Sequence, residues 1–233
     1  MNKSENKSGS LCPAVKASAI IGDKWVLLIL RELFLGAHRY NDFQKAIARI
    51  SPTVLSGRLK DMETAGLLIK RTVSGKKGGE YRLTKSGREL GPIIDHLSRW
   101  GLRWTRRSLK DEDIDVAGFM WDFHRSLNLD ELPDGKTVLS VQFPEQETYK
   151  KWWLIIENGT VDLCTEDPGF DIDIYIVSSL ISMVSVWMGD STLKEELASQ
   201  AMTLTGDHYL MKTAARWFAL SRYSDVRPVS SLK

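Results

Sequence analysis

The residues best suited to chemistry lie between positions 52 and 65, where small polar side chains repeat at helical spacing. Leu55, Leu59 and Met62 recur as apolar residues do on the buried face of an α-helix. The opposite face holds hydroxyls, a glycine and a cation, at Thr53, Gly57, Lys60 and Thr64, with Ser56 at its edge. Small side chains let a helix enter the DNA major groove, where hydroxyls and lysines reach base edges and phosphates. The alternative is an ordinary solvated helix surface.

Local signals place this helix after three others. Ser51 is a strong N-cap, and Pro52 fits the first helical position, where no amide donor is needed. Glycines after the last apolar residue of a run mark helix ends. The predicted helices cover about residues 13–21, run from Asp23 to Gly36, start near Tyr40 with Phe43, Ala46 and Ile47 inward, and cover about residues 52–65.

A hairpin is predicted directly after the fourth helix. Leu67–Val73 and Glu80–Leu83 are strand-like, and the turn between them is rich in glycine and contains Lys76 and Lys77. A hairpin with a cationic tip beside a helix-turn-helix is a wing, here over about residues 70–83. Its lysines can lie along a phosphate backbone and add affinity more than sequence reading.

Thr84 is expected to cap one long helix with a wide apolar stripe. Such a stripe needs a partner, either a second copy of the chain or the chain's own second half. We favour dimerisation, because paired half-sites are how such DNA-binding domains gain specificity. The stripe consists of Leu90, Ile93, Ile94, Leu97, Trp100, Gly101 and Trp104.

The charge is divided unevenly between the two halves of the 233-residue chain. Residues 1–110 carry 22 Lys and Arg against 9 Asp and Glu, a net of +13, and residues 111–233 carry 10 against 21, a net of −11. A basic half suits a nucleic-acid partner, and the length suits two domains. We expect a flexible tail over residues 1–11, one domain over 12–110 and another over 115–233.

Other whole-chain features narrow the class of protein. No apolar stretch is long enough to span a membrane, and the polar start shows no signal peptide, so we expect a cytoplasmic protein without a membrane partner. Cys12 and Cys164 are far apart and fit neither a disulfide framework nor metal-ligand spacing. We predict no metal and no cofactor.

The acidic half is predicted to be α+β. After a charged link over 110–115, an apolar helix contains Phe119, Met120, Trp121 and Phe123. Alternation then predicts an antiparallel meander with one buried face. Its strands are Val138–Phe143, Trp152–Glu157, Val161–Cys164 and Asp171–Ile176, with a hairpin turn at Asn158-Gly159; helices over 178–188 and 193–200, a strand over 202–206 and a last helix capped by Asp207 follow.

No catalytic constellation is evident in this half. Asp171 and Asp173 are expected on one face of a strand, with no His or Cys nearby in sequence. Solvated strand residues are the better interpretation, because the alternation with isoleucine already explains them. His124 and His208 are isolated. We therefore expect no enzyme activity.

The N-terminal half resembles the HxlR-type branch of bacterial winged-helix regulators, relatives of the MarR group. The resemblance runs in order through Cys12-Pro13, 21–33, 39–43, 50–60, 65–67 and 81–90. It implies a mostly helical α+β winged helix-turn-helix that binds double-stranded operator DNA as a homodimer, with the fourth helix in the major groove. The DNA-binding residues it nominates are Ser51, Thr53, Ser56, Arg58 and Lys60, flanked by Arg39, Tyr40, Lys76 and Lys77.

Two positions qualify this resemblance. Arg58 borders the core face of its helix, so it either touches a phosphate or braces the fold. Gly57 stands where the family often has Gln or another polar residue, which weakens any inference about base preference. Members of the family often place a cysteine at the Cys12 position, where some sense oxidants. Cys12 is accordingly a candidate redox residue, and an inert small core residue is the alternative.

The acidic half resembles the sterol-carrier-protein-2-like domain over about residues 115–222. The similar segments are 153–159, 171–174, 186–190 and 204–207. The resemblance implies a five-stranded, mostly antiparallel sheet with helices on one side and an apolar tunnel for a lipid-like small molecule. A filled core is the alternative. The candidate lining residues are Leu180, Val184, Trp187, Met188, Leu210 and Trp217.

Together these features predict a dimeric DNA-binding regulator whose operator affinity changes when the acidic domain binds an apolar ligand. One alternative is that the acidic domain only supports dimerisation or meets another protein. Another is a lipid or small-molecule carrier in which the winged-helix half is mainly a dimerisation scaffold.

Overall fold

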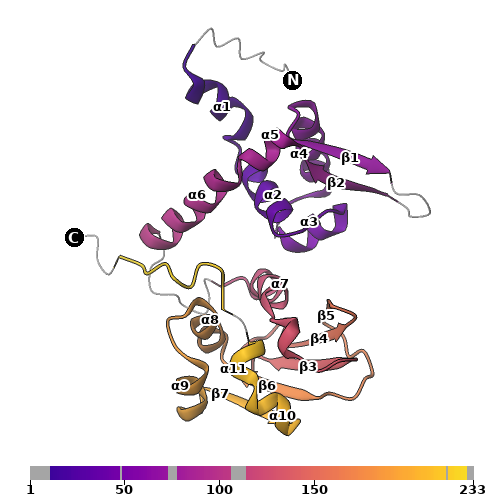
Figure 1. Ribbon diagram of the computed structural model, residues 1–233, viewed down its shortest axis with the longest axis vertical. Coiled ribbons are helices and arrows are strands. Elements are labelled where there is room, and N and C mark those ends of the chain that lie inside the picture. Colours follow the sequence, from indigo (N-terminus) through magenta and orange to yellow (C-terminus); the bar gives the residue numbers. More distant parts are fainter. Residues whose placement is uncertain (1–10, 48, 73–77, 106–113, 219, 230–233) are drawn as a thin grey trace. The chain divides into compact units, whose positions relative to one another are not determined.

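The computed structural model describes residues 11–47, 49–72, 78–105, 114–218 and 220–229 (Figure 1). The chain divides into two compact units, residues 1–98 and 99–233. The wing lysines Lys76 and Lys77, the predicted tail up to Ser10 and most of the predicted link lie outside the described residues.

The first unit is a set of helices with one hairpin. Its elements are α1 (Pro13–Ile21), α2 (Lys24–Phe34), α3 (Tyr40–Ala46), α4 (Pro52–Thr64), β1 (Leu68–Thr72), β2 (Gly79–Leu83), α5 (Lys85–Glu89) and the start of α6 (Gly91–Trp104). Two predicted caps are confirmed: Asp23 accepts a hydrogen bond from the Trp25 amide at 2.8 Å, and Ser51 accepts one from the Val54 amide at 3.3 Å. Each cap satisfies an amide that the helix itself leaves without a partner.

The core of this unit lies between α2, α3, α4 and the hairpin. Leu55, Leu59 and Met62 of α4 are all buried, which confirms the predicted inner face. Phe43 of α3 is fully buried and meets the Tyr81 ring of β2 edge-on, with 6.0 Å between ring centroids. The polar face of α4 is consequently left to solvent.

The hairpin is joined to the start of α3. β1 and β2 pair antiparallel, and Arg39 forms an isolated β-bridge to Glu80. The Tyr81 amide donates to the His38 carbonyl at 2.7 Å. These contacts therefore hold the hairpin beside the start of α3, the helix that precedes α4 in sequence.

The prediction of a single long helix after Thr84 is wrong. The structure has two helices there, α5 and α6, separated at Leu90. Pro92 explains the break. A proline has no amide to donate, and its ring clashes with the carbonyl four residues earlier, so it is tolerated only in a first helical turn. The cap by Thr84 is confirmed, since its hydroxyl accepts from the Gly87 amide at 3.1 Å.

The second unit is a five-stranded sheet with helices. It contains the last turn of α6, then α7 (Val116–Ser126), η2 (Leu129–Glu131), β3 (Thr137–Gln142), β4 (Lys151–Glu157), β5 (Thr160–Cys164), β6 (Ile174–Ser178), α8 (Leu180–Met188), α9 (Leu193–Ala198), β7 (Met202–Gly206), α10 (His208–Lys212) and α11 (Ala214–Trp217). The strand order is β5-β4-β3-β6-β7. The last predicted helix is therefore two short ones.

The predicted meander is correct for three strands and wrong for the fourth. β6 does not pair with β5; it pairs parallel with β3, and the other neighbouring pairs are antiparallel. Alternation shows which face of a strand is buried but not which strand lies beside it. The sheet is thus mixed, mostly antiparallel, with β3 at its centre.

One face of the sheet carries the core. Ile174 and Ile176 are fully buried in a cluster with side chains from α7, α8, α10 and α11, whereas Tyr175 between them is 42% exposed. Leu139 and Leu154 on the neighbouring strands belong to the same cluster. The helices therefore cover one side of the sheet, as the sequence predicts.

The predicted strand at Asp171–Ile176 starts three residues later than expected, so neither Asp171 nor Asp173 lies in it. The Asp173 carboxylate instead accepts the Val138 amide at 2.7 Å. Asp171 is exposed. The interpretation as solvated strand residues is therefore right for Asp171 in its exposure but not in its place in the strand, and it is wrong for Asp173, which caps the start of the β3–β6 pairing.

The last turn of α6 is tied to the end of the chain within the second unit. Arg99 forms an ion pair with Asp225 at 2.7 Å and lies over the Tyr223 ring at 5.6 Å. The Val229 amide donates to the Arg103 carbonyl at 2.9 Å. Because the boundary between the units falls after Ser98, α6 belongs to both of them.

Neither a membrane-spanning helix nor a metal cluster is present in the described ranges. No helix there is long and apolar enough to cross a membrane. No group of His, Cys, Asp and Glu side chains there could hold a metal ion.

Candidate nucleic-acid interface

The solvent-facing side of α4 carries the predicted reading residues. Thr53, Ser56 and Lys60 are all exposed. Within the part of the chain that the structure describes, the side chains of Thr53 and Lys60 make no hydrogen bond or ion pair. Both side chains are therefore available to an outside partner.

Tyr40 positions the first turn of α4. Its hydroxyl donates to the Pro52 carbonyl at 2.9 Å and accepts from the Ser56 hydroxyl at 3.3 Å. The start of α3 and the start of α4 are thereby held together by one phenol. Tyr40 and Ser56, nominated as DNA contacts, thus also hold the helix in place.

Arg58 braces the fold, which is one of the two roles that the sequence leaves open. Its guanidinium reaches the Asp23 carboxylate at 2.7 Å and the Asp61 carboxylate at 3.2 Å. The hydrogen bond to Asp23 is the main reason that the pKa of Arg58 is raised. Burial acts to raise the pKa of Asp23. Hydrogen bonds from the Trp25 amide and from Arg58 outweigh burial, so the pKa of Asp23 is lowered. This ion pair joins α4 to the cap of α2.

Removing this brace is expected to cost modest stability. Asp23→Asn and Arg58→Ala, alone and together, should show a coupling free energy of up to about 1 kcal/mol in urea unfolding, because exposed ion pairs are screened by water. The two side chains are 35% and 36% exposed. A coupling of zero would mean that the pair does not join the helices in solution.

A groove of about 770 Å³ lies between α3, α4 and the hairpin. It brings together four of the predicted residues from two helices. It also adds Asn41 and Lys70, which the sequence analysis did not nominate. Lys70 could have been found from the period of two along β1, since it shares a face with the buried Leu68. The lining residues are Arg39, Tyr40, Asn41, Ser56, Leu59, Lys60, Glu63, Lys70, Gly78, Gly79, Glu80 and Tyr81.

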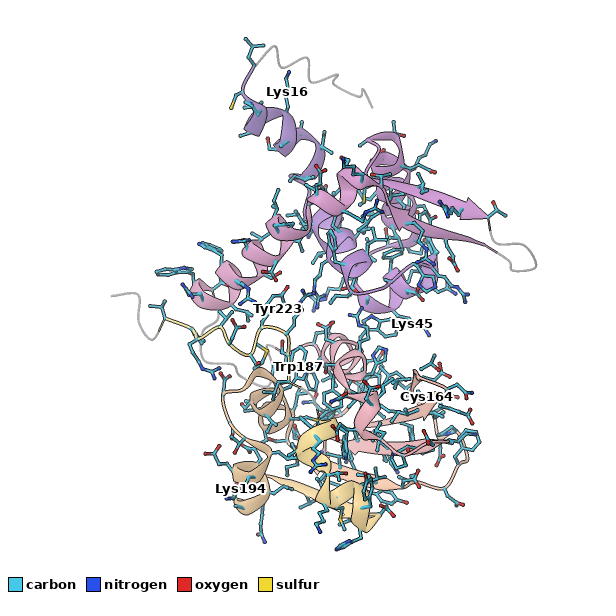
Figure 2. The ribbon with its side chains drawn as sticks, in the orientation of Figure 1. Lys16, Lys45, Cys164, Trp187, Lys194 and Tyr223 are labelled. Carbon is cyan, nitrogen blue, oxygen red and sulfur yellow. The ribbon has the colours of Figure 1, made fainter. Side chains whose placement is uncertain are left out.

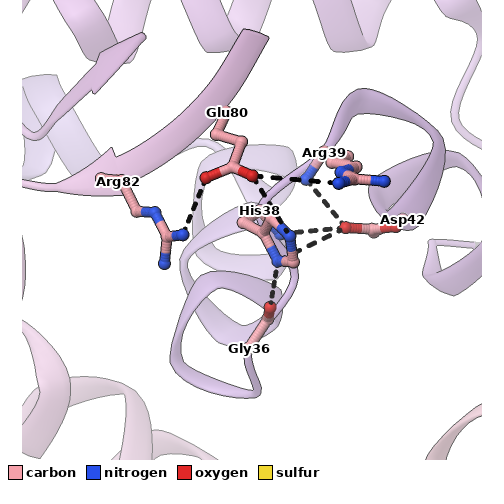
Figure 3. Close-up of polar contacts among 6 residues, drawn as sticks. All are labelled: Gly36, His38, Arg39, Asp42, Glu80 and Arg82. Carbon is pink, nitrogen blue, oxygen red and sulfur yellow. Dashed lines mark hydrogen bonds and ion pairs between the residues drawn. The ribbon is translucent and has the colours of Figure 1, made fainter. Parts of the chain in front are cut away.

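Glu80 links the hairpin to the start of α3 (Figure 3). It pairs with Arg82 at 2.8 Å, with His38 at 3.8 Å and with Arg39 at 4.0 Å. The hydrogen bond from Arg82 is the main cause of the lowered pKa of Glu80. On the other side, Asp42 accepts the Arg39 amide at 2.8 Å. These contacts fix where the Arg39 side chain enters the groove.

Comparison with known proteins assigns this arrangement to a family. The HxlR-like helix-turn-helix family matches residues 20–109. The HTH-type transcriptional regulator YvaP of Bacillus subtilis is 37% identical over 114 residues, which are 48% of this chain and all of YvaP. The chain belongs to the HxlR-like helix-turn-helix transcriptional regulators.

Other transcriptional regulators match over a similar length. The regulator YdeP of Bacillus subtilis is 34% identical, over 41% of this chain and 76% of YdeP. Among solved structures, the redox regulator HypR in its oxidized form is 28% identical, over 42% of this chain and all of that chain, with a TM-score of 0.38. The family match ends before β3.

Two further nominated residues, Ser51 and Cys12, do not line the groove of this HxlR-like regulator. Ser51 is exposed but its hydroxyl is engaged as the cap of α4. Cys12 is exposed at the start of α1 and is not in a disulfide. Lys76 and Lys77 lie outside the described residues. The groove is therefore formed by α3, α4 and the base of the wing.

The six nominated ligand-lining residues lie in the core of the second unit or pack against it. Trp217 and Leu180 are fully buried. Trp187, labelled in Figure 2, is partly buried and donates from its indole nitrogen to the Ser126 hydroxyl at 2.8 Å. Val184, Met188 and Leu210 are buried in the same cluster. These side chains pack against one another rather than facing solvent.

Proposed function

We propose that this transcriptional regulator binds double-stranded DNA as a homodimer, with α4 in the major groove and the wing alongside. The observation that carries the proposal is the groove in which Lys60 and Ser56 of α4 meet Arg39, the N-cap residue of α3, and Lys70 of β1. Cations that line the gap between a recognition helix and a wing suit the phosphate ridge between two DNA grooves.

Charge and exposure support this proposal. Residues 1–110 carry a net charge of +13, from 22 cations and 9 anions. Phosphate contacts fix the position of the protein on the duplex, whereas Thr53 and Ser56 are the side chains suited to base edges. Lys60 is the exposed cation on the same face of α4.

Apolar surface on two helices supports dimerisation. Ile93, Leu97, Trp100 and Trp104 of α6 are 49%, 45%, 57% and 43% exposed. α1 has no buried residue, although it contains Val15 and Ile20. Large apolar side chains grouped on a helix surface mark an interaction site. A second copy of the chain fits, because two-fold partners place two recognition helices in successive major grooves.

The DNA-binding test is fluorescence anisotropy of the full chain on labelled DNA from its own upstream region and on scrambled DNA, over a salt series. Lys60→Ala is expected to weaken binding to both DNAs about tenfold and to lower the salt slope by about one, because one phosphate contact is lost.

The matched control is Lys194→Ala, which removes a lysine that is also exposed, from α9 of the second unit (Figure 2). It should leave affinity and slope unchanged. If both variants behave alike, α4 is not the contact surface and the proposal fails.

The similarity of the second unit to the sterol-carrier-protein-2-like domain stays a prediction. Five strands with helices on one face agree with what that resemblance implies. The six nominated residues form a packed core, so a ligand would have to separate side chains that now touch. Control of DNA binding by an apolar ligand, a carrier role and a redox role for Cys12 accordingly stay predictions.

A further inference from the structure

We propose that the outer face of the β1–β2 hairpin is a second phosphate-binding surface, which holds the DNA strand opposite to the one held by the groove. The inference rests on the proposed DNA binding and extends it to residues that neither the motifs nor the groove include. It concerns Arg71, Arg82 and Arg88.

The hairpin has two faces of different surroundings. Residues opposite each other in an antiparallel pair share a face. Lys70 lies opposite Tyr81, on the face that packs against α3 through Phe43. Arg71 lies opposite Glu80, and Ile69 lies opposite Arg82. These last four side chains form the outer face, and Glu80 among them also reaches the edge of the groove.

The outer face is hollowed and cationic. A hollow of about 850 Å³ there is lined by Ile69, Arg71, Thr72, Glu80, Arg82, Leu83, Thr84 and Arg88. Three arginines from β1, β2 and α5 thus converge on one surface with a single carboxylate. Arg82 is held by Glu80 at 2.8 Å, and these two charges cancel. A net charge of +2 is left by Arg71 and Arg88.

The two remaining arginines are arranged for an outside anion. Arg88 donates one nitrogen to the Leu83 carbonyl at 2.8 Å, which positions its guanidinium without neutralising it. Arg71 is exposed and has no hydrogen-bond or ion-pair partner among the described residues. A guanidinium presents a planar fork of donors that matches phosphate oxygens.

The geometry of a duplex indicates why both faces of one hairpin are cationic. The minor groove is about 6 Å wide and is bordered by the phosphates of two strands. A wing that lies in or across it meets one backbone with each face. Lys70 and Lys60 serve the inner side, and Arg71 and Arg88 serve the outer side. Ile69, 39% exposed beside them, can contact sugar carbons.

The test compares full-length Arg71→Ala/Arg88→Ala with Arg216→Ala/Arg222→Ala, a control that removes two exposed arginines from the second unit. The outer-face variant should lose at least about tenfold in affinity and about two units of salt slope, equally on upstream and scrambled DNA. The control should match the wild type. Arg71→Glu alone should also weaken binding. Because Arg71 has no polar partner among the residues that the structure describes, this variant guards against misfolding of the double variant.

Phosphate-ethylation interference assigns the strand. On one strand, ethylated phosphates that impair wild-type binding should have no effect on the outer-face variant. On the other strand, they should have no effect on Lys60→Ala. If Arg71→Glu and the double variant both bind DNA as tightly as the wild type while Lys60→Ala is impaired, the inference is overturned and the proposed function stands. Loss of poly-glutamate binding with unchanged DNA binding would instead assign the hollow to an acidic protein. Failure of the wild type to bind DNA would overturn both.

Discussion

Replacing Leu97 and Trp100 of α6 with glutamate is expected to abolish the proposed dimer and with it about a thousandfold of operator affinity. The two side chains are 45% and 57% exposed, so the single chain tolerates the change. In a dimer they would be buried, and an unpaired charge in an interface is strongly unfavourable. A monomer on a single half-site has little more than non-specific affinity. Specific binding typically exceeds non-specific binding by at least about a thousandfold.

The measurements are sedimentation equilibrium for the dimer and anisotropy for DNA. The control is Tyr209→Glu/Leu220→Glu, which places the same charges at apolar residues that are 57% and 51% exposed in the second unit. It should dimerise and bind as the wild type does. A dimer that survives the α6 changes would show that α6 is not the interface, and equal dissociation in the control would show a general effect of added charge.

Acid is expected to destabilise the second unit through His124. Burial is the main cause that lowers the pKa of His124 from 6.5 to about 4, and the neighbouring Arg125 adds to it. Above pH 6.5 the imidazole is neutral in both the folded and the unfolded chain. Between pH 6.5 and 4 the unfolded chain takes up a proton that the folded chain refuses, so the free energy of unfolding falls. One pKa unit corresponds to about 1.4 kcal/mol, which predicts a loss of about 3 kcal/mol by pH 4.

The measurement is urea unfolding of the wild type and of His124→Gln between pH 7.5 and 4. His124→Gln should be less stable at neutral pH, because the buried imidazole packs on Trp121 with 4.7 Å between centroids. Its stability should change less with pH, since the buried imidazole that causes the loss is absent. His208→Gln is the control, because His208 is exposed. Equal pH dependence in wild type and His124→Gln would exclude His124 as the cause.

Helix starts were predictable because their signals are local. Ser51 and Asp23 each cap an amide only two or three residues away. The parallel pairing of β6 with β3 joins residues 35 positions apart, such as Leu139 and Ile174, and no local pattern specifies it. Burial of a strand depends on its own alternation, whereas its neighbour depends on the path of the whole chain.

The candidate site divides in the same way. The exposed face of α4 follows from helical geometry alone, and Thr53 and Lys60 lie on it as expected. The roles of Tyr40 and Arg58 could not be read from spacing, because their partners Ser56 and Asp23 are 16 and 35 positions away. Arg71 and Arg88 were missed because a cation on a strand looks solvated until the neighbouring element is placed beside it.

α6 has a consequence for dissecting the molecule. Its residues pass from one unit into the other without a break, and Arg99 and Arg103 are attached to Asp225 and Val229 near the end of the chain. Dividing the chain after Ser98 would cut α6 in the middle and separate its first half from the half that holds Arg99 and Arg103. Limited proteolysis should for the same reason spare the middle of α6 around Ser98.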